Sequence, residues 1–228
     1  MTNNEMSATK HILIIDDHPM SVDGYIALLS SIKTNKNAEY HLAYNCKEGA
    51  DLIKEMETNN TVIDIAFIDV NLPPYEEKKI QSGVDLAVLL RKIVPSCKIV
   101  IISMHSEPVW VNQIFKIINP EGFISKNDIN YKLFPDACQR ILNNEQYIST
   151  SIAKSKKYFI QKNFNWDEYD SKILLLISEG KKTMNLPNYI PLSLSTIEKR
   201  KANMKKQLIY DVGSDLELVE AAKKMGFI

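Results

Sequence analysis

The chain has 228 residues, of which 45% are hydrophobic and 25% are charged, and its 28 basic side chains balance 28 acidic ones. This composition is typical of folded globular proteins and excludes disordered and fibrous classes. Because the chain shows neither an apolar run of roughly 20 residues nor a signal peptide, and because its three cysteines are widely spaced, we expect a cytoplasmic protein without disulfides or a membrane partner.

The first part of the chain, residues 10–143, alternates short apolar runs with amphipathic stretches. The apolar runs are rich in β-branched residues and are predicted to be strands: His11–Asp16, Tyr40–Tyr44, Ile63–Asp69, Lys98–Ser103 and Gly122–Ser125. The stretches between them show helical spacing of apolar residues: Ser21–Ile32, Lys47–Met56, Val84–Ile93, Pro108–Ile118 and Tyr131–Leu142. This alternation predicts a doubly wound α/β domain around a five-stranded parallel sheet.

The second part of the chain has a different pattern. Ser149–Asn165 is polar and lysine-bearing, so we interpret residues 144–163 as a linker that is partly helical. Residues 164–228 are predicted to form a small all-α domain with helices at Tyr169–Glu179, Ser195–Leu208 and Asp215–Met225 and a short piece near Met184–Tyr189. Residues 1–142 carry 14 basic and 18 acidic side chains, whereas residues 143–228 carry 14 and 10. This asymmetry indicates two modules, the second of which is suited to a polyanion.

Polar side chains follow several of the predicted strands at the point where each strand ends. Asp16 and Asp17 end the first strand, Asp69 the third and Ser103 the fourth, and Lys126 follows the fifth. In a parallel sheet these ends share one edge, and ligands bind beyond that edge. Two carboxylates roughly 4 Å apart repel each other by about 4 kcal/mol at an effective dielectric constant of ~20, and a divalent cation relieves that repulsion.

The residue types at this edge suit phosphoryl chemistry. An all-oxygen site with open positions favours magnesium, because Mg²⁺ retains water and binds phosphate oxygens. Lys126 and the Ser103 hydroxyl can hold a phosphoryl group. Asp69 is the expected nucleophile, since a carboxylate can carry a phosphoryl group as an acyl phosphate. His18 and His105 flank the same edge, but their spacing fits no zinc signature.

A first resemblance rests on Asp16-Asp17-His18-Pro19, Asp69 with Pro73, Ser103, and Gly122-Phe123-Ile124-Ser125-Lys126. As an ordered set, these residues resemble the receiver domain of two-component response regulators. The resemblance implies a flavodoxin-like fold over residues 10–143. It also implies that Asp69 accepts a phosphoryl group from the phosphohistidine of a sensor histidine kinase or a phosphotransfer protein.

The same resemblance implies roles for the surrounding residues. Asp17, Asp69 and the backbone carbonyl of Asn71 would bind Mg²⁺, and Asp16 would act mainly through water. Ser103 and Lys126 would then hold the phosphoryl group. Phe123 stands at the position of the family's switch aromatic residue, which turns inward on activation. Because Phe123 has no hydroxyl group, its switching is expected to be steric.

The loop after Asp69 departs from the family pattern. A charged segment between Pro73 and Gly83 is longer than the family usually has there. We interpret this segment as a solvated loop, with partner docking or gating as the alternative.

In the predicted helix Ser195–Leu208, apolar and basic residues lie on different faces. Ile197, Met204 and Leu208 repeat at helical spacing and form the apolar face. A basic solvent face on a helix that follows a turn suits phosphate contacts and entry into the major groove of DNA. The residues expected to contact DNA are Ser195, Thr196, Lys199, Arg200, Asn203 and Lys206.

A second resemblance rests on Leu174–Gly180, Leu192–Ile197, Asn203, Leu208 and Leu216–Phe227. These segments are similar to the LuxR/NarL-type helix-turn-helix output domain, which implies a four-helix domain over residues 164–228 that binds DNA as a dimer. Two departures stand out. Pro187 and Pro191 discourage a regular scaffold helix, and Glu198 occupies a position where lysine is common.

We therefore expect a non-enzymatic transcriptional regulator that is phosphorylated on Asp69 and forms a homodimer when phosphorylated. One alternative, favoured by the two prolines, is an adaptor whose altered output domain binds protein rather than DNA. Another is an aspartyl-phosphate hydrolase. That activity would require an acid two residues beyond the nucleophile, where this chain has Asn71.

Overall fold

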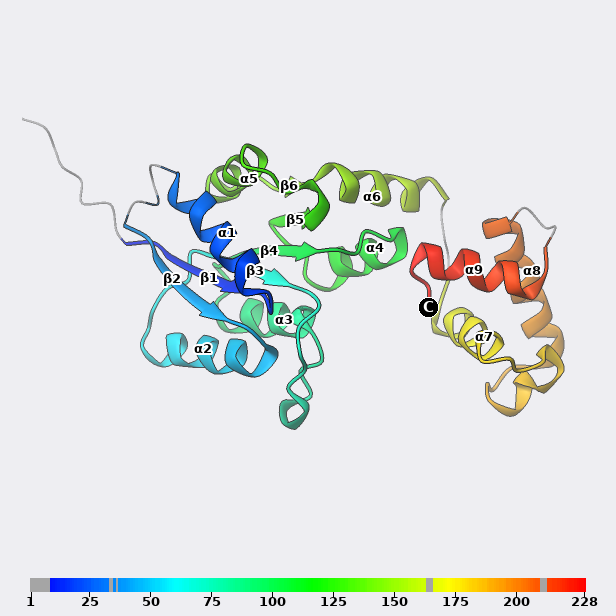
Figure 1. Cartoon of the computed structure of the whole chain (residues 1–228). Helices are drawn as coiled ribbons and strands as arrows, with labels where there is room; N and C mark the ends of the chain where they lie inside the picture. Colours follow the sequence, from blue (N-terminus) through cyan, green and yellow to red (C-terminus); the bar gives the residue numbers. More distant parts are fainter. Residues whose placement is uncertain (1–8, 33–34, 36, 163–165, 210–212) are drawn as a thin grey trace, which may run out of the picture. The chain divides into compact units, whose positions relative to one another are not determined.

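The computed structural model describes residues 9–32, 35, 37–162, 166–209 and 213–228 (Figure 1). The chain divides into two compact units, one built mostly from residues up to 153 and the other mostly from residues 154–228. Among the described residues, no helix combines the length and the apolar composition that crossing a membrane requires.

The first unit is built on a parallel sheet with the strand order β2-β1-β3-β4-β5-β6. Its strands are β1 (His11–Ile15), β2 (Glu39–Ala43), β3 (Ile65–Asp69), β4 (Lys98–Ser103), β5 (Gly122–Ser125) and β6 (Tyr147–Ile148). The prediction of five strands was wrong by one, because β6 pairs in parallel with β5. This strand is only two residues long and half-buried, so it has no apolar run that the sequence pattern could reveal.

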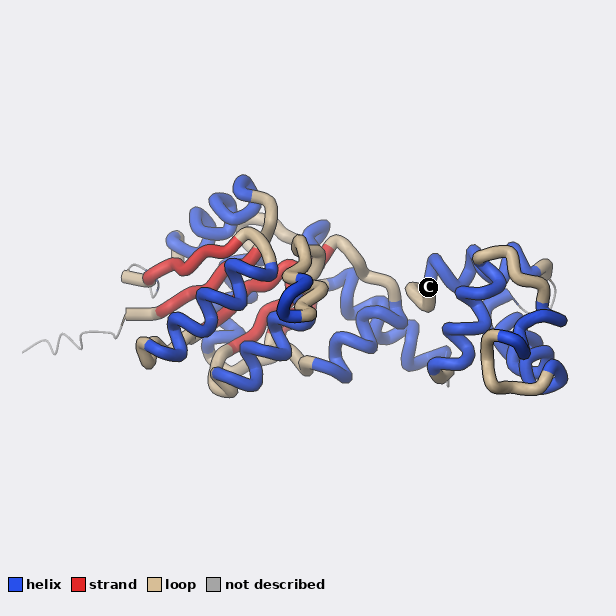
Figure 2. Tube along the Cα trace, turned by 90° about the horizontal axis from the view of Figure 1, so that it is seen from below, coloured by secondary structure: helices blue, strands red, loops and turns tan. Residues whose placement is uncertain are grey.

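Helices cover both faces of this sheet. They are α1 (Pro19–Ser30), α2 (Cys46–Thr58), α3 (Gly83–Ile93), α4 (Pro108–Ile117) and α5 (Leu133–Leu142). Figure 1 shows α1 and α5 on one face and α2 and α3 on the other, and Figure 2 shows helices lying over the strands in the view from below. The doubly wound α/β prediction is therefore confirmed.

Alternation along the strands explains how both faces are packed. Ile12 and Ile14 of β1 join a buried cluster with Phe67 of β3 and Phe134 of α5. The intervening β1 residues face the opposite layer. A Cβ placed on Gly49 of α2 would lie 3.1 Å from Ile15 Cδ1, so α2 approaches the sheet closely on that side. Both faces of β1 are therefore apolar, as expected for a central parallel strand.

The long loop after Asp69 forms a small hairpin. Tyr75 and Ile80 make an isolated antiparallel bridge around the 3₁₀ turn Glu76–Lys78. The charged side chains of the turn are exposed. This placement agrees with a solvated loop, and the alternative of partner docking stays untested.

The second unit is helical. Its elements are α6 (Thr150–Lys162), α7 (Glu168–Ser178), the 3₁₀ segment Thr183–Asn188, α8 (Leu194–Ile209) and α9 (Asp215–Met225). Side chains from α7, the 3₁₀ segment, α8 and α9 form one apolar core, which includes Ile173, Leu186, Ile197 and Leu218. Pro187 lies inside the 3₁₀ segment. The expectation that prolines prevent a regular helix here is therefore confirmed.

The segment predicted as a linker is largely ordered. Residues 144–163 contain β6 and most of α6, and residue 163 lies outside the described residues. The partly helical character expected for this segment is therefore observed. The domain limits 10–143 and 164–228 remain predictions.

Candidate functional site

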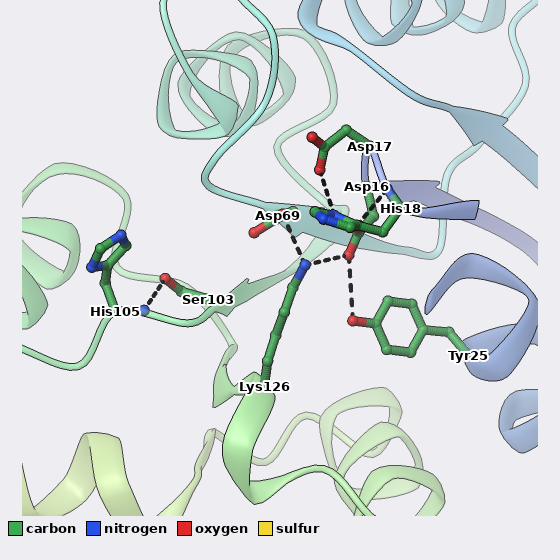
Figure 3. A network of polar contacts seen from close by, with 8 residues as sticks. All are labelled: Asp16, Asp17, His18, Tyr25, Asp69, Ser103, His105 and Lys126. Atoms are coloured by element: carbon green, nitrogen blue, oxygen red, sulfur yellow. Dashed lines mark hydrogen bonds and ion pairs between the residues drawn. The ribbon is translucent and has the colours of Figure 1, made fainter. Parts of the chain in front are cut away.

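Four strands deliver the polar residues of the candidate site to one edge of the sheet. Asp16 follows β1, Asp69 ends β3, Ser103 ends β4 and Lys126 follows β5. These strands are consecutive neighbours in the sheet and run in parallel, so their carboxyl ends meet (Figure 3). The predicted convergence of these side chains is what the structure shows.

Lys126 joins two buried carboxylates. Its Nζ atom lies 2.8 Å from Asp16 Oδ2 and 2.9 Å from Asp69 Oδ2 (Figure 3). The side chains of Asp16 and Asp69 are only 1% and 3% exposed. Burial raises the pKa of Asp69, although the hydrogen bond from Lys126 acts in the opposite direction. Burial also acts to lower the pKa of Lys126, but the hydrogen bonds to Asp16 and Asp69 outweigh it and raise that pKa.

Asp16 is fixed by contacts on several sides. The backbone N–H of His18 donates to Asp16 Oδ1 at 3.0 Å, and the Tyr25 hydroxyl donates to Asp16 Oδ2 at 3.3 Å. Burial, followed by the charge of Asp16, raises the pKa of Tyr25 well above its ordinary value. Tyr25 therefore remains a neutral donor to this carboxylate.

Sequence analysis did not identify Tyr25 as a site residue. Tyr25 lies three positions after Val22 and four before Leu29, on the buried stripe of α1. Helical spacing therefore predicts that it points toward the sheet. Its position one turn into the helix after Asp16-Asp17 is the signal that could have placed its hydroxyl at the site.

Asp17 lies at the border of the pocket. Its Oδ1 atom is buried and lies 2.7 Å from His18 Nδ1, yet among the described residues it has no partner with hydrogen-bond geometry. One ligand atom from each of Asp16, Asp17, His18 and Asp69 lies within 4.8 Å of the others. This cluster could hold a metal ion. Three of its four residues are carboxylates, which are ligands for hard cations.

The remaining predicted residues lie on the loop after Asp69 and on the strands β4 and β5. The backbone N–H of Asn71 donates to the Asp69 carboxylate. Ser103 is fully buried, and its Oγ accepts the backbone N–H of His105 at 2.9 Å. Phe123 is also fully buried, with its ring centroid 5.8 Å from that of Phe115. In this structure Phe123 thus already points into the protein.

Gly83 leaves room for the backbone of Asp69. A Cβ at this position would lie only 1.8 Å from the backbone oxygen of Asp69. The amino end of α3 therefore packs directly against the chain that carries the candidate nucleophile. No other residue type fits here without a shift of the backbone.

In the second unit, α8 presents most of the residues that were expected to contact DNA. Ser195, Lys199, Asn203 and Lys206 are exposed, and Thr196 is partly buried. Arg200 differs, because its guanidinium lies 2.9 Å from carboxylate oxygens of Asp167 and of Asp170. The flanking lysines Lys201 and Lys205 both contact Asp215, at 3.0 Å and 2.8 Å. The DNA contacts themselves remain a prediction.

Comparison with known proteins gives consistent results for both units. Residues 12–133 match the family model of the response regulator receiver domain. The response regulator UvrY of Escherichia coli (strain K12) is 21% identical over 227 residues, which cover 95% of this chain and 94% of UvrY. The transcriptional regulatory protein MctR of Rhizobium johnstonii is 22% identical over 199 residues, which cover 86% of each chain.

Solved structures resemble this chain over nearly its whole length. A structure of the response regulator RcsB in complex with DNA has a TM-score of 0.66 and 18% identity, and covers 95% of this chain and 98% of that one. A structure of RcsB from Salmonella typhimurium has a TM-score of 0.69 and 18% identity, and covers 94% of this chain and all of that one. At this level of identity the likeness concerns the fold.

Proposed function

Because the chain belongs to the response regulator receiver family, we propose that it is a transcriptional response regulator. Its first unit accepts a phosphoryl group on Asp69, and its second unit binds DNA. The observation that carries this proposal is the bridge from Lys126 to both Asp16 and Asp69. A buried ammonium between two carboxylates, at the carboxyl edge of a parallel sheet, is the arrangement that can receive a dianionic group.

The chemistry begins with Asp69. A carboxylate oxygen of Asp69 attacks the phosphorus of a phosphohistidine on a sensor histidine kinase or phosphotransfer protein. The phosphorus–nitrogen bond breaks as the new oxygen–phosphorus bond forms. Mg²⁺ bound by Asp17, Asp69 and the Asn71 carbonyl, with Asp16 acting through water, would neutralise the phosphoryl oxygens. Lys126 contributes a positive charge, and Ser103 contributes a hydroxyl donor.

Phosphorylation would alter the contacts around Asp69. Lys126 exchanges a carboxylate for a phosphoryl oxygen, and Ser103 moves toward the same group. Phe123, which is already buried, would follow these changes through packing alone. Moving a two-state equilibrium from 1:99 to 99:1 requires about 5.5 kcal/mol of differential stabilisation. We propose that this shift exposes a homodimer interface in the phosphorylated form.

The output part of the proposal rests on α8. The exposed row of Ser195, Lys199, Asn203 and Lys206 follows a turn and carries two cationic side chains. Such a surface can contact phosphates at the edges of the major groove. The domains are then a receiver over 10–143, a linker over 144–163 and an output domain over 164–228. The three cysteines are free thiols, as is usual in the cytoplasm.

A second candidate function is a phosphorylated adaptor that binds protein instead of DNA. The observation favouring it is that Arg200, Lys201 and Lys205 are engaged in ion pairs within the unit, which reduces the charge offered to DNA. Salt dependence separates the two functions. DNA binding through several phosphates weakens steeply as the salt concentration rises.

The decisive test of the receiver function replaces Asp69 with asparagine. After incubation with Mg²⁺ and acetyl phosphate, the wild-type protein should show an acid-labile mobility shift on a phosphate-affinity gel, and D69N should show none. Asp23→Asn, an exposed carboxylate on α1, serves as the matched control and should shift like the wild type. A shift that persists in D69N would place the phosphorylated residue elsewhere.

A further inference from the structure

Two histidines and a glutamate meet at the amino end of the sheet, at the opposite end of β1 from the acidic pocket. His11 begins β1, Glu39 begins β2, and His41 lies two positions further along β2. The strand register pairs His11 with Glu39 and Leu13 with His41. Residues two apart on a strand share a face, so all three side chains lie on the face that α2 covers. Neither the acidic pocket nor the output unit uses them.

The distances between their ligand atoms match a coordination sphere. His11 Nδ1 lies 3.1 Å from His41 Nε2 and 3.5 Å from Glu39 Oε2. One ligand atom from each residue lies within 4.8 Å of the others. Zinc binds such ligands at about 2.0–2.2 Å in a tetrahedron, which sets ligand atoms roughly 3.3–3.5 Å apart. A hydrogen bond alone would explain the short distance between the two imidazole rings. Here, however, the Glu39 carboxylate also approaches His11 Nδ1, the same nitrogen atom that contacts His41.

The surroundings favour a bound cation. Both histidines are partly buried, and Glu39 is exposed and can adjust its side chain. The carboxylates of Glu39 and Glu55 add negative charge around His41. Asp64 accepts the backbone N–H of His11 at 2.9 Å and so fixes the start of β1.

We propose that His11, Glu39 and His41 form a binding site for Zn²⁺, with water in the fourth position. Imidazole and carboxylate ligands suit Zn²⁺ better than Mg²⁺, which prefers oxygen ligands throughout. The ion would link β1 to β2, the edge strand of the sheet. It would lie about five residues, or roughly 16 Å, from Asp16 along β1. The proposal does not depend on the function proposed above.

The test measures Zn²⁺ affinity of the full chain by competition with a chromogenic chelator, in millimolar Mg²⁺ to occupy the acidic pocket. The wild-type protein should bind one Zn²⁺ per chain. His41→Gln and Glu39→Gln should each weaken binding by at least about 100-fold, because loss of even an outer-shell partner of a metal ligand costs roughly 10–100-fold in affinity. The Glu39 side chain is 62% exposed, so its replacement leaves the core intact. His105→Gln removes a histidine elsewhere and should leave the affinity unchanged.

A second readout is the melting temperature. Zn²⁺ should raise the melting temperature of the wild type and of His105→Gln, because a ligand that binds only the folded state stabilises it. The melting temperature of His41→Gln should not rise, because this variant lacks the site. The proposal is wrong if the wild type shows no saturable Zn²⁺ binding. It is also wrong if Zn²⁺ binding survives His41→Gln and Glu39→Gln but is lost in His18→Gln, which would place the ion in the acidic pocket.

Discussion

In the first unit, two carboxylates and one ammonium meet at a sheet edge where almost no solvent reaches them. In the second unit, five basic side chains lie on α8: three of them are paired with aspartates of the same unit, and the other two, Lys199 and Lys206, face solvent. Charges of the first kind interact strongly and have fixed positions, because burial and several partners hold each one. Charges on the exposed face of α8 are screened by water and salt. The first unit is therefore suited to chemistry that needs fixed distances, and the second unit to long-range electrostatic attraction.

The buried site should therefore be sensitive to added volume, which gives the largest predicted effect. Gly83→Ala would drive a methyl group into the backbone oxygen of Asp69. We expect a loss of about 3 kcal/mol in the free energy of unfolding, together with slower phosphorylation, because the backbone that carries Asp69 must move. Urea denaturation and phosphorylation by acetyl phosphate measure the two effects.

Gly24 provides the matched control for this substitution. It lies within α1, and a Cβ there would meet no atom within 4 Å. Gly24→Ala should raise the free energy of unfolding by about 0.5–1 kcal/mol, because alanine favours the helix. If the two alanine variants were equally stable, the tight packing of α3 on Asp69 would be refuted.

Two lysines of α8 differ in whether their charge faces solvent or is held in an ion pair. Lys199 is exposed, whereas Lys201 Nζ contacts Thr183 Oγ1 at 2.7 Å and Asp215 Oδ2 at 3.0 Å. Lys199→Gln should weaken binding to duplex DNA and lower the slope of log affinity against log salt by about 1. Lys201→Gln should change the affinity little and lower the melting temperature instead.

DNA affinity is measured by fluorescence anisotropy with a labelled duplex. The measurement uses the phosphorylated protein and is repeated over a range of salt concentrations. Equal losses of affinity in both lysine variants would contradict the assignment of Lys201 to an internal ion pair. Absence of DNA binding in the wild type under all conditions would favour the adaptor.

The smallest predicted effect is a loss of stability in acid that originates in the second unit. Burial acts to raise the pKa values of Asp167 and Asp215, but hydrogen bonds outweigh it and hold both below the ordinary aspartate value. The donors to Asp167 are Arg200 and the backbone N–H groups of Asp170 and Tyr169, and those to Asp215 are Lys205 and Lys201. Because the folded-state pKa values are lowered, the stabilisation is present above the ordinary aspartate pKa and is lost as the pH falls through the folded-state values.

Arg200→Gln tests this pH dependence. The variant should lose less stability than the wild type between neutral and acidic pH, because Asp167 would titrate nearer its ordinary value. Melting temperatures across the acidic range provide the measurement, and Lys199→Gln is the control with an exposed charge. An unchanged acid response in Arg200→Gln would show that its ion pairs contribute nothing to folding.

Much of the first unit could be predicted from local patterns. Apolar, β-branched runs identified five of the strands, and polar residues at the ends of those runs identified Asp16, Asp69 and Ser103. The pattern failed for β6, because two half-buried residues carry no periodicity. It also passed over Tyr25, whose hydroxyl group matters only because α1 packs beside the end of β1. The fold prediction for the second unit is confirmed by the RcsB structures. In place of a regular scaffold helix, the second unit has a 3₁₀ segment that contains Pro187.

Local sequence patterns were enough to predict which residues end the strands, and therefore that an acidic edge exists, because parallel strands share the edge at which their carboxyl ends lie. Which charges meet could be seen only in the folded chain. It showed that Lys126 reaches both Asp16 and Asp69, that Arg200 is engaged by two aspartates, and that His11 meets Glu39 and His41. The reason is physical: distances between side chains far apart in the chain depend on strand order, register and helix packing, which periodicity alone does not fix.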